Sequence, residues 1–402
     1  FLDWVVQTEN FVSQDKALIA NSFLPRQVYG HYLCTIWEAA KNKAHKKQIK
    51  LTVIDSFVTD LKVSNTAVTL LLNNGSEVTT DYCVIASGNQ VPRNPRIKNP
   101  EFYQSKNYYQ NPWKIESVLN TKNDKAVLII GNGLTMVDTV LALLEHGFKG
   151  DIFSVSPNGF NILPHRHNGL KYTKLVEELT GNLSLHELFK LVHKHIKSVR
   201  EFGVSAEPVI DSLRPYTQQI WRSFTDAERK LFMSRFRHLW GVARHRIPLH
   251  SHDKIQQLRI DGKLHLYSGK IIDLTETSEG IRLDFFNKKE KEVQSVYVSR
   301  VINCTGPETD VRNMENCFLK NCLINGVITQ DNLKLGIKTD TRTFQVIDAA
   351  GEKHPNLFTI GANLKGELWE STAVNELRVQ AQNLAEQIVA PLPEPTPAGA
   401  EL

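Results

Sequence analysis

A strand, a glycine turn, a helix and a second strand follow one another near the middle of the chain. Ala126–Ile130 is a continuous apolar run, and Gly131-Asn132-Gly133 ends it. Leu134–His146 then carries apolar residues at helical spacing, and Asp151–Ser156 is strand-like again. This order predicts a βαβ unit with both strands parallel in one sheet. The chain is therefore expected to belong to the α/β class.

The turn inside this unit is a candidate dinucleotide site. Gly131 permits a tight turn, and Gly133 lets the backbone approach a pyrophosphate whose charge rests on the N–H groups at the start of the helix. A glycine pair also occurs in plain α/β sheets, and the third glycine of the usual motif is replaced by Met136. The strand–turn–helix–strand setting favours the dinucleotide. The pyrophosphate-binding residues are expected to be Gly131, Gly133, Leu134 and Thr135, with Asn132 in the same cofactor site.

The end of the second strand indicates which dinucleotide binds. An acidic residue there would bind a ribose 2′-hydroxyl, whereas basic or hydroxyl groups suit a 2′-phosphate. The strand ends in Ser154-Val155-Ser156-Pro157 without Asp or Glu, and Arg166 lies just downstream between His165 and His167. NADPH is therefore favoured over NADH, with Ser156 and Arg166 binding the 2′-phosphate. The alternative is that Arg166 only faces solvent.

Three other buried-type strands end on a glycine, and they divide the chain. They are Tyr82–Ala86 before Ser87-Gly88, Arg300–Cys304 before Thr305-Gly306, and Asn356–Ile360 before Gly361-Ala362. Ahead of the first, four strand-like segments predict a short β-meander: Ile49–Val53, Phe57–Val63, Ala67–Leu72 and Glu77–Thr80.

A helical insertion is expected over about residues 168–258. It contains two capping-box sequences, Ser184–Glu187 and Thr225–Glu228. A last helix is predicted over Ser371–Ile388, and residues 390–402 are expected to form a disordered tail because they are Pro, Ala and Glu without periodicity.

Composition excludes several classes of protein. The 402 residues carry 48 Lys and Arg against 43 Asp and Glu, a net charge of +5 with both signs spread along the chain, which does not favour nucleic acid. No apolar run approaches the roughly 20 residues that cross a bilayer. The five cysteines include no CxxC pair, which favours a reducing, cytoplasmic compartment. The basic run Lys41–Lys50 is interpreted as a solvated helix end, with a nucleic-acid or lipid contact as the alternative.

Two further groups of residues have open or negative interpretations. The His, Arg and Trp residues of 236–246 are either an anion or substrate surface or a helix end with a cationic last turn. His186-Glu187 lacks the second histidine of a zinc-protease motif, since position 190 is Lys190, so no metal site is expected. No G-x-S-x-G sequence is present to indicate a hydrolase.

The order of these motifs resembles the two-dinucleotide-binding-domain flavoproteins, the group of flavin monooxygenases and pyridine-nucleotide disulfide reductases. More narrowly, five stretches resemble the bacterial FAD/NAD(P)-binding proteins of the YdhS-like group: Phe23–Leu33, Gly133–Asp138, Arg244–Pro248, Val301–Pro307 and Gly366–Val374. The resemblance implies an α/β fold of two Rossmann-like domains, in which an NAD(P) domain with a helical insertion interrupts an FAD domain. The implied bounds are 1–92 and 307–389 for the FAD part and 93–306 for the NAD(P) part.

The resemblance also implies cofactors and further site residues. FAD and NADPH are expected, and Arg26, Ser87, Gly88, Gly361 and the turn Trp369–Thr372 should approach FAD, with Thr305, Gly306 and Ala362 also in the cofactor sites. The family begins with a strand, a glycine-rich turn and a helix that hold the FAD pyrophosphate. None of these precedes Phe1, so the sequence is expected to be a truncated version of a longer flavoprotein.

The implied activity is hydride transfer from NADPH to FAD and on to oxygen or an organic acceptor. Monooxygenase and simple reductase remain alternatives, because both need only flavin, NADPH and a pocket for a small molecule. A disulfide reductase is disfavoured, because no CxxC pair stands beside a predicted flavin. A second hypothesis is a catalytically silent NADP-binding sensor in which the Gly131 site alone remains.

Overall fold

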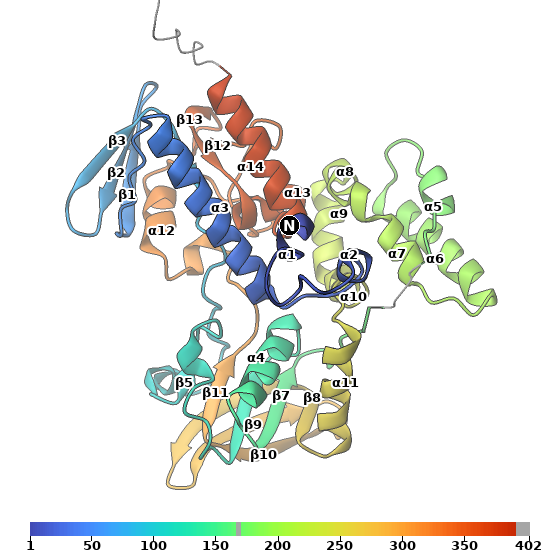
Figure 1. The fold of residues 1–402 in the computed structure, drawn as a ribbon. Helices are drawn as coiled ribbons and strands as arrows, with labels where there is room; N and C mark the ends of the chain where they lie inside the picture. Colours follow the sequence, from blue (N-terminus) through green and yellow to red (C-terminus); the bar gives the residue numbers. More distant parts are fainter. Residues whose placement is uncertain (166–169, 391–402) are drawn as a thin grey trace, which may run out of the picture. The chain divides into compact units, whose positions relative to one another are not determined.

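The computed structural model describes residues 1–165 and 170–390. The chain forms two compact units, Phe1–Phe57 and Val58–Leu402. The first unit holds three helices, α1 (Leu2–Val5), α2 (Lys16–Ala20) and α3 (Arg26–Lys46), drawn in dark blue in Figure 1. Asp15 caps α2 by accepting a hydrogen bond from the Ala17 N–H group.

The basic run Lys41–Lys50 falls at the end of α3, as predicted. Lys43, His45 and Lys46 lie in its last turn, where cations are favourable against the helix dipole. The predicted strand Ile49–Val53 is wrong, because these residues are in neither a helix nor a strand. Ile49 and Val53 are 59% and 70% exposed, so the apolar run has no partner strand to bury it.

A seven-stranded sheet in the second unit contains the βαβ segment. Its order is β10-β9-β8-β7-β6-β11-β5, parallel from β8 to β5 and antiparallel from β8 to β10. The strands are β5 (Tyr108–Tyr109), β6 (Ala126–Ile130), β7 (Asp151–Ser156), β8 (Leu264–Thr277), β9 (Gly280–Asn287), β10 (Glu292–Val298) and β11 (Arg300–Asn303). The predicted strands Ala126–Ile130 and Asp151–Ser156 are confirmed as β6 and β7, and Arg300–Cys304 is confirmed as β11, which ends one residue earlier.

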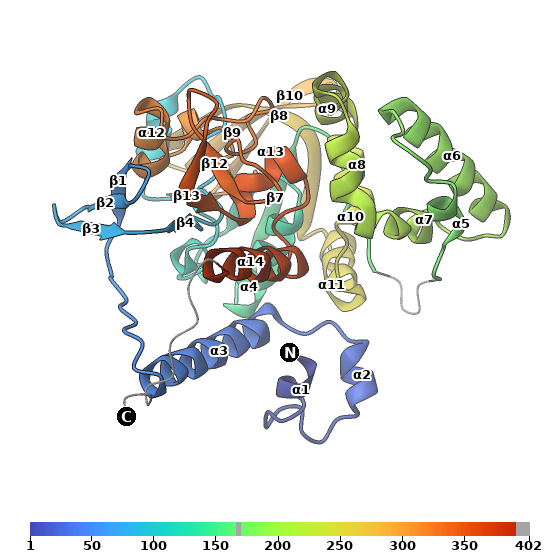
Figure 2. The same cartoon turned by 90° about the horizontal axis from the view of Figure 1, so that it is seen from above.

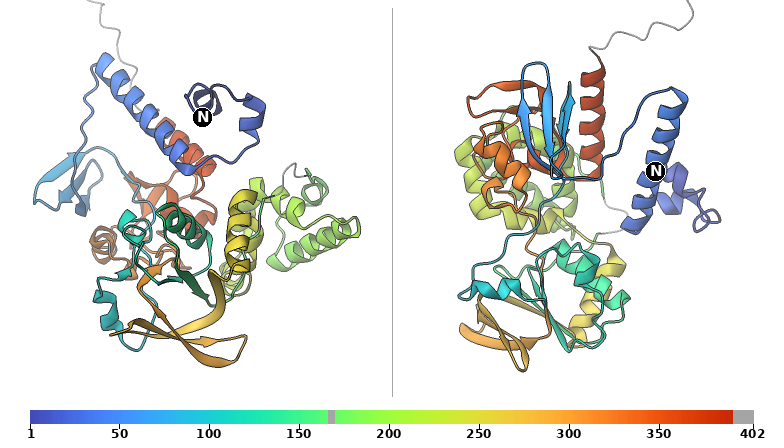
Figure 3. Two further views of the ribbon diagram at one scale, coloured as in Figure 1. Left: turned by 60° about the horizontal axis from the view of Figure 1, so that its bottom comes forward. Right: turned by 90° about the vertical axis from the view of Figure 1, so that its left-hand side faces the viewer.

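Strand β6 lies between β7 and β11 in this sheet and is buried on both faces, which explains its unbroken apolar sequence. Val127 and Ile129 pack with α4 (Leu134–Glu145) and α11 (Leu249–Ile260), which lie on the same face (Figure 3). Leu128 packs on the other face with Phe285 of β9 and with Phe102 of the 3₁₀ helix Pro100–Gln104. Met136 is 2% exposed and fills the space that a third glycine would leave between helix and sheet.

Two smaller sheets complete the second unit. One is antiparallel, with β1 (Val58–Val63), β2 (Val68–Leu72) and β3 (Glu77–Thr80). The other joins β4 (Cys83–Ile85) in parallel to β13 (Lys353–Thr359), which pairs antiparallel with β12 (Gln345–Ile347). Both sheets share a core with α12 (Cys317–Ile324), seen in orange beside β1 in Figure 1. The chain therefore leaves this core after β4 and returns to it after residue 306.

Between β7 and β8, the described residues form seven α-helices. They are α5 (Lys174–Glu177), α6 (Leu185–Glu201), α7 (Glu207–Ser212), α8 (Thr217–Ser223), α9 (Asp226–Leu231), α10 (Arg237–Arg244) and α11. Both predicted capping boxes form, at Ser184 and at Thr225. Helix α8 contacts α13 (Lys365–Leu368), and Figure 2 shows the two side by side.

The last helix, α14, spans Val374–Val389 and so begins three residues later than predicted. The predicted tail lies outside the described residues, apart from Ala390. Among the helices of residues 1–165 and 170–390, none has both the length and the apolar composition needed to cross a bilayer.

Candidate functional site

A cavity of about 720 Å³ opens at the carboxyl ends of β6, β7 and β11. The chain moves from β6 through α4 to β7 on one side, while β11 pairs with β6 on the other. Ligands of open α/β sheets bind at such a reversal of strand order. The residues that line the cavity are 95–96, 130–135, 155–158, 160, 162, 237, 238, 241, 242, 245, 269–271 and 304–306. All five predicted residues of the glycine turn are among them.

Gly131 is required by the way the strands meet. Its φ of +103° lies in the region that favours glycine, and a Cβ atom there would stand 2.6 Å from the carbonyl oxygen of Cys304. The Gly131 N–H donates to the Val155 carbonyl at 2.8 Å, and its own carbonyl accepts from the Ser154 hydroxyl at 3.1 Å. Both hydrogen bonds fix the turn to β7, while the Cys304 carbonyl after β11 leaves no room for a side chain.

Gly133 has a different role, because nothing lies within 4 Å of the position its Cβ would take. It is the N-cap of α4, and no side chain caps the helix. Leu134 and Thr135 both line the cavity, so the first N–H groups of the helix are available to an anion there. The Asn132 side chain instead donates to the Phe160 carbonyl at 2.5 Å and holds the loop after β7.

The cavity wall is basic. It carries five basic side chains and, among the described lining residues, no Asp or Glu: Arg96, Arg237, His238, His245 and Lys270. Burial is the main cause that lowers the pKa of His238 and His245, so both imidazoles are neutral near pH 7. The positive charge comes from Arg96, Arg237 and Lys270, and it suits a ligand with several phosphates.

Asn303, at the end of β11, organises one side of this cavity. Its amide nitrogen donates to the Arg93 carbonyl at 3.0 Å and to the Tyr108 hydroxyl at 3.1 Å. Its amide oxygen accepts from the N–H group of Thr305 at 3.2 Å and from the Thr305 hydroxyl at 2.7 Å. Asn303 is fully buried, so these bonds fix both the predicted residue Thr305 and the segment that leads to Arg96.

Sequence reasoning missed Arg96, Lys270 and Asn303. Lys270 reaches the cavity through the observed register, in which Ser268 pairs with Ser156 and Lys270 lies two residues further on. Neither Lys270 nor Arg96, which lies in a proline-rich segment, has a local sequence signal.

The predicted 2′-phosphate residues have different outcomes. Ser156 lines the cavity, and its hydroxyl accepts a hydrogen bond from the Gly159 N–H at 3.1 Å. Arg166 and His167 lie outside the described residues. Burial is the main cause that lowers the pKa of His165, and the positive charge of the nearby Arg246 lowers it further.

The basic cluster of residues 236–246 divides into two groups. Arg237, His238 and His245 line the cavity. Arg244 instead pairs with Glu370 at 3.1 Å, and Arg246 forms ion pairs with Glu207 and Asp211.

Cys304 borders the cavity without offering a reactive thiol. Its sulfur lies 3.4 Å from the Thr139 hydroxyl, and burial raises the pKa of the thiol to about 12. Because the thiolate is the nucleophile, this cysteine is inert at neutral pH. All five cysteines are free, and none of the described His, Cys, Asp and Glu residues forms a metal-binding group.

Three of the residues predicted to approach FAD come together with Ala362 at the ends of β4 and β13. The Ser87 hydroxyl accepts from the Asn363 amide at 3.2 Å, and this bond joins Ser87 and Gly88 to the turn that contains Gly361 and Ala362. The Gly361 N–H group donates to the Gln380 side chain at 2.8 Å. These strands are parallel, so the residues lie at the edge where such sheets bind ligands.

The remaining predicted residues lie elsewhere. Thr372 is exposed just before α14, whose N-terminus has no side-chain cap. Trp369 stacks on Trp221 with ring centroids 5.1 Å apart, so its ring faces the helical insertion. Arg26 is the first residue of α3 and belongs to the unit Phe1–Phe57.

A family model described as FAD-NAD(P)-binding matches residues 1–90. Comparison with curated proteins gave no match. Solved structures with the same fold include an ornithine N-hydroxylase from Kutzneria sp. 744, with 11% identity and a TM-score of 0.61 over 97% of this chain and 82% of that one. The ornithine hydroxylase of Pseudomonas aeruginosa has 14% identity and a TM-score of 0.60 over 97% and 81%. The cadaverine monooxygenase of Erwinia amylovora has 15% identity and a TM-score of 0.57 over 100% and 83%.

The chain therefore has the α/β fold of two-dinucleotide-binding-domain flavoproteins, as the order of its motifs predicted. The fold is shared with flavin-dependent monooxygenases and with a bacillithiol disulfide reductase from Staphylococcus aureus, which has 11% identity and a TM-score of 0.50 over 88% of this chain and 75% of that one.

Proposed function

We propose that this chain is an NAD(P)H-dependent flavin oxidoreductase of the YdhS-like group. The observation that carries the proposal is the basic cavity at the ends of β6, β7 and β11, with the uncapped N-terminus of α4 at its wall. A nicotinamide and a flavin bound together supply hydride transfer to oxygen or to an organic acceptor. The protein's part is to bind and orient these groups.

The cavity fits a nicotinamide dinucleotide. The open space at Gly133 admits a pyrophosphate next to the first N–H groups of α4, and Arg96 and Arg237 add charge to the wall. NADPH is favoured over NADH because Ser156 and Lys270 both line the cavity, with no carboxylate among the described lining residues. Thr305 and Gly306 close the site from β11.

The other part of the chain fits a flavin nucleotide. Ser87, Gly88, Gly361 and Ala362 lie at the ligand-binding edge of two parallel strands, and the uncapped α14 stabilises negative charge near Thr372. We propose that residues 1–92 and 307–389 form the FAD part and residues 93–306 the NAD(P) part. The shared core of the two smaller sheets supports the grouping of residues 58–92 with residues 307–389.

The oxidised substrate is a small molecule or oxygen in this proposal, and a disulfide is disfavoured. The five cysteines include no CxxC pair, and the pKa of Cys304 is raised by burial. Release of hydrogen peroxide distinguishes an oxidase-like reductase from a monooxygenase that forms a hydroxylated product.

A second candidate is a catalytically silent NADP-binding sensor. It is favoured by one observation: every described residue that lines the basic cavity lies between Pro95 and Gly306. The nicotinamide site therefore needs no residue from the proposed FAD part.

Cofactor retention separates the two candidates. Purified protein is incubated with FAD, passed through a desalting column and examined by visible spectroscopy, while NADP⁺ binding is measured by calorimetry. The oxidoreductase retains about one FAD per chain and binds NADP⁺. A colourless protein that binds NADP⁺ would establish the sensor instead.

A further inference from the structure

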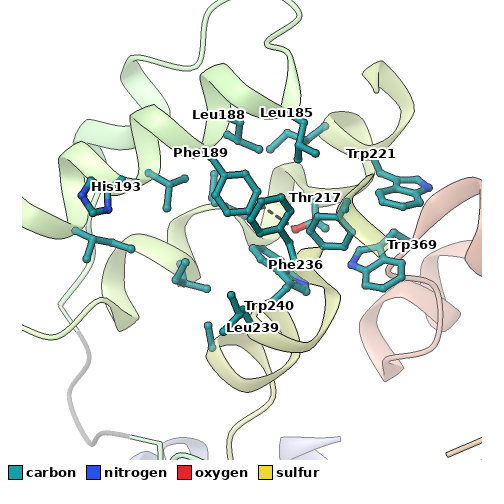
Figure 4. Close-up of a pocket in the computed structure, with 17 residues that line it drawn as sticks. Leu185, Leu188, Phe189, His193, Thr217, Trp221, Phe236, Leu239, Trp240 and Trp369 are labelled. Carbon is teal, nitrogen blue, oxygen red and sulfur yellow. Dashed lines mark hydrogen bonds between the residues drawn. The ribbon is translucent and has the colours of Figure 1, made fainter. Parts of the chain in front are cut away.

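A second cavity, of about 270 Å³, lies within the helical insertion (Figure 4). Its walls come from α6, α7, α8, α10 and the turn between α9 and α10, and Trp369 closes one side. We infer that this cavity binds an uncharged molecule with an aromatic ring. Its assignment as the pocket for the acceptor substrate rests on the proposed function.

The wall consists mainly of aliphatic and aromatic side chains, and most of its polar groups are already hydrogen-bonded. None of its described residues is Asp, Glu, Lys or Arg. The indole N–H of Trp221 donates to the Gly366 carbonyl at 2.8 Å, and that of Trp240 donates to Glu370 at 3.2 Å. The Thr217 hydroxyl donates to the Leu213 carbonyl at 3.1 Å. A charged ligand would lose its hydration without a partner, whereas an apolar one would not.

His193 is the other polar residue on the wall, and it is exposed to solvent. Leu239 and Phe189 are also exposed, at 53% and 36%. The cavity therefore has an accessible rim with apolar side chains, through which a ligand can enter. Its interior is lined mostly by apolar and aromatic side chains, as in pockets that bind small apolar ligands.

The backbone is irregular in the segment that supplies two of the aromatic side chains on the wall. Phe232–Phe236 is a π-helical turn between α9 and α10, a distortion that occurs often at functional sites. It sets the Phe236 ring 4.0 Å from that of Phe189, centroid to centroid. An apolar cavity of about 150 Å³ binds benzene in another protein, so 270 Å³ accommodates a molecule with two rings.

Trp369 connects this cavity to the segment expected near FAD. Its φ of +61° is unusual for a residue with a side chain, and the stacked Trp221 holds its ring in place. The next residue, Glu370, is bound by Trp240 and Arg244 of α10. A ligand in the cavity would therefore lie against the residue that begins the proposed flavin-facing turn.

The probe for this cavity is N-phenyl-1-naphthylamine, an uncharged two-ring fluorophore whose emission rises in apolar surroundings. We expect saturable binding that indole displaces and the diamine cadaverine does not. Ala243→Phe fills the cavity from α10 and should weaken binding at least tenfold. Ala227→Phe makes the same change at an exposed position of α9 and should leave binding unchanged.

A second pair of variants applies if Ala243→Phe is not folded by circular dichroism. Val192→Asp puts a carboxylate on the wall and should also weaken binding, whereas Val379→Asp, on the exposed face of α14, should not. Absence of saturable binding, equal binding by Ala243→Phe or Val192→Asp, or displacement by cadaverine would overturn the inference. The assay involves neither NADPH nor turnover, so a failure of the proposed function would leave its result unaffected.

Discussion

A Cβ atom on Gly131 would stand 2.6 Å from the carbonyl oxygen of Cys304, where β6 and β11 end side by side. Gly133, two residues further on, has open space at the same position. The first glycine is therefore required by the fold, and we propose that the second makes room for the ligand. This difference can be measured.

Gly131→Ala should destabilise the protein by about 2 kcal/mol or more, because alanine meets both the close carbonyl and a strained φ. Gly133→Ala, at a φ of −81°, should change the unfolding free energy by less than about 1 kcal/mol and weaken NADP⁺ binding at least tenfold. Urea unfolding and calorimetry test the pair. Equal destabilisation by both substitutions would contradict this division.

Lys270→Gln should discriminate between the two nicotinamide cofactors. Loss of a charged contact to the 2′-phosphate predicts about tenfold weaker binding of NADPH and little change for NADH. Lys254→Gln, on the exposed face of α11 and outside the cavity, is the matched control. If Lys270→Gln weakens both cofactors equally, Lys270 does not recognise the 2′-phosphate.

Glu370→Gln should lower stability by about 2 kcal/mol, because it leaves the buried Arg244 guanidinium without its carboxylate. Asp151→Asn removes the partner of Lys263 in an exposed ion pair and should cost less than about 1 kcal/mol. Thermal denaturation compares the two variants. A similar, small loss for both would show that Glu370 does not fasten the helical insertion.

Stability should depend on the protonation of His245. Burial lowers the pKa of His245 from its ordinary 6.5, so in mildly acidic solution the unfolded chain binds a proton that the folded chain does not. The contribution of His245 to the free energy of unfolding is complete above about pH 6.5 and is lost as the pH falls below that value. Burial raises the pKa of Asp331 and Glu367, so these two groups make the folded protein less stable as the pH rises. Their effect on stability is the same in wild type and in a His245 variant.

The measurement is the melting temperature at about pH 7.5 and about pH 5.5, in wild type and in His245→Gln. The variant should lose less stability than wild type between these two values. An identical loss would mean that His245 is protonated equally in both states.

The sequence predicted the parts of this fold that depend on local patterns. The apolar strand β6, the turn at Gly131 and the capping boxes at Ser184 and Thr225 each have a signal of period, glycine position or residue spacing. The strand predicted over Ile49–Val53 failed because an apolar run becomes a strand only where a partner covers it.

The candidate site was predictable where its residues follow or end a predicted strand, as at the turn of Gly131, at Ser156 and at Gly306. Arg96 and Lys270 reach the cavity through tertiary contacts, one through the bonds of Asn303 and the other through the register of β8 on β7. Neither contact has a local sequence signal. The direction of the Trp369 ring was likewise set by distant packing against Trp221.

The most direct test of the central claim is anaerobic reduction of the FAD-loaded protein by NADPH, which is measured as the loss of yellow flavin absorbance. The account predicts complete bleaching by about one equivalent of NADPH, much slower bleaching in Gly133→Ala, and recovery of the colour when oxygen is admitted. A protein that binds both FAD and NADPH and keeps its flavin absorbance unchanged would contradict it.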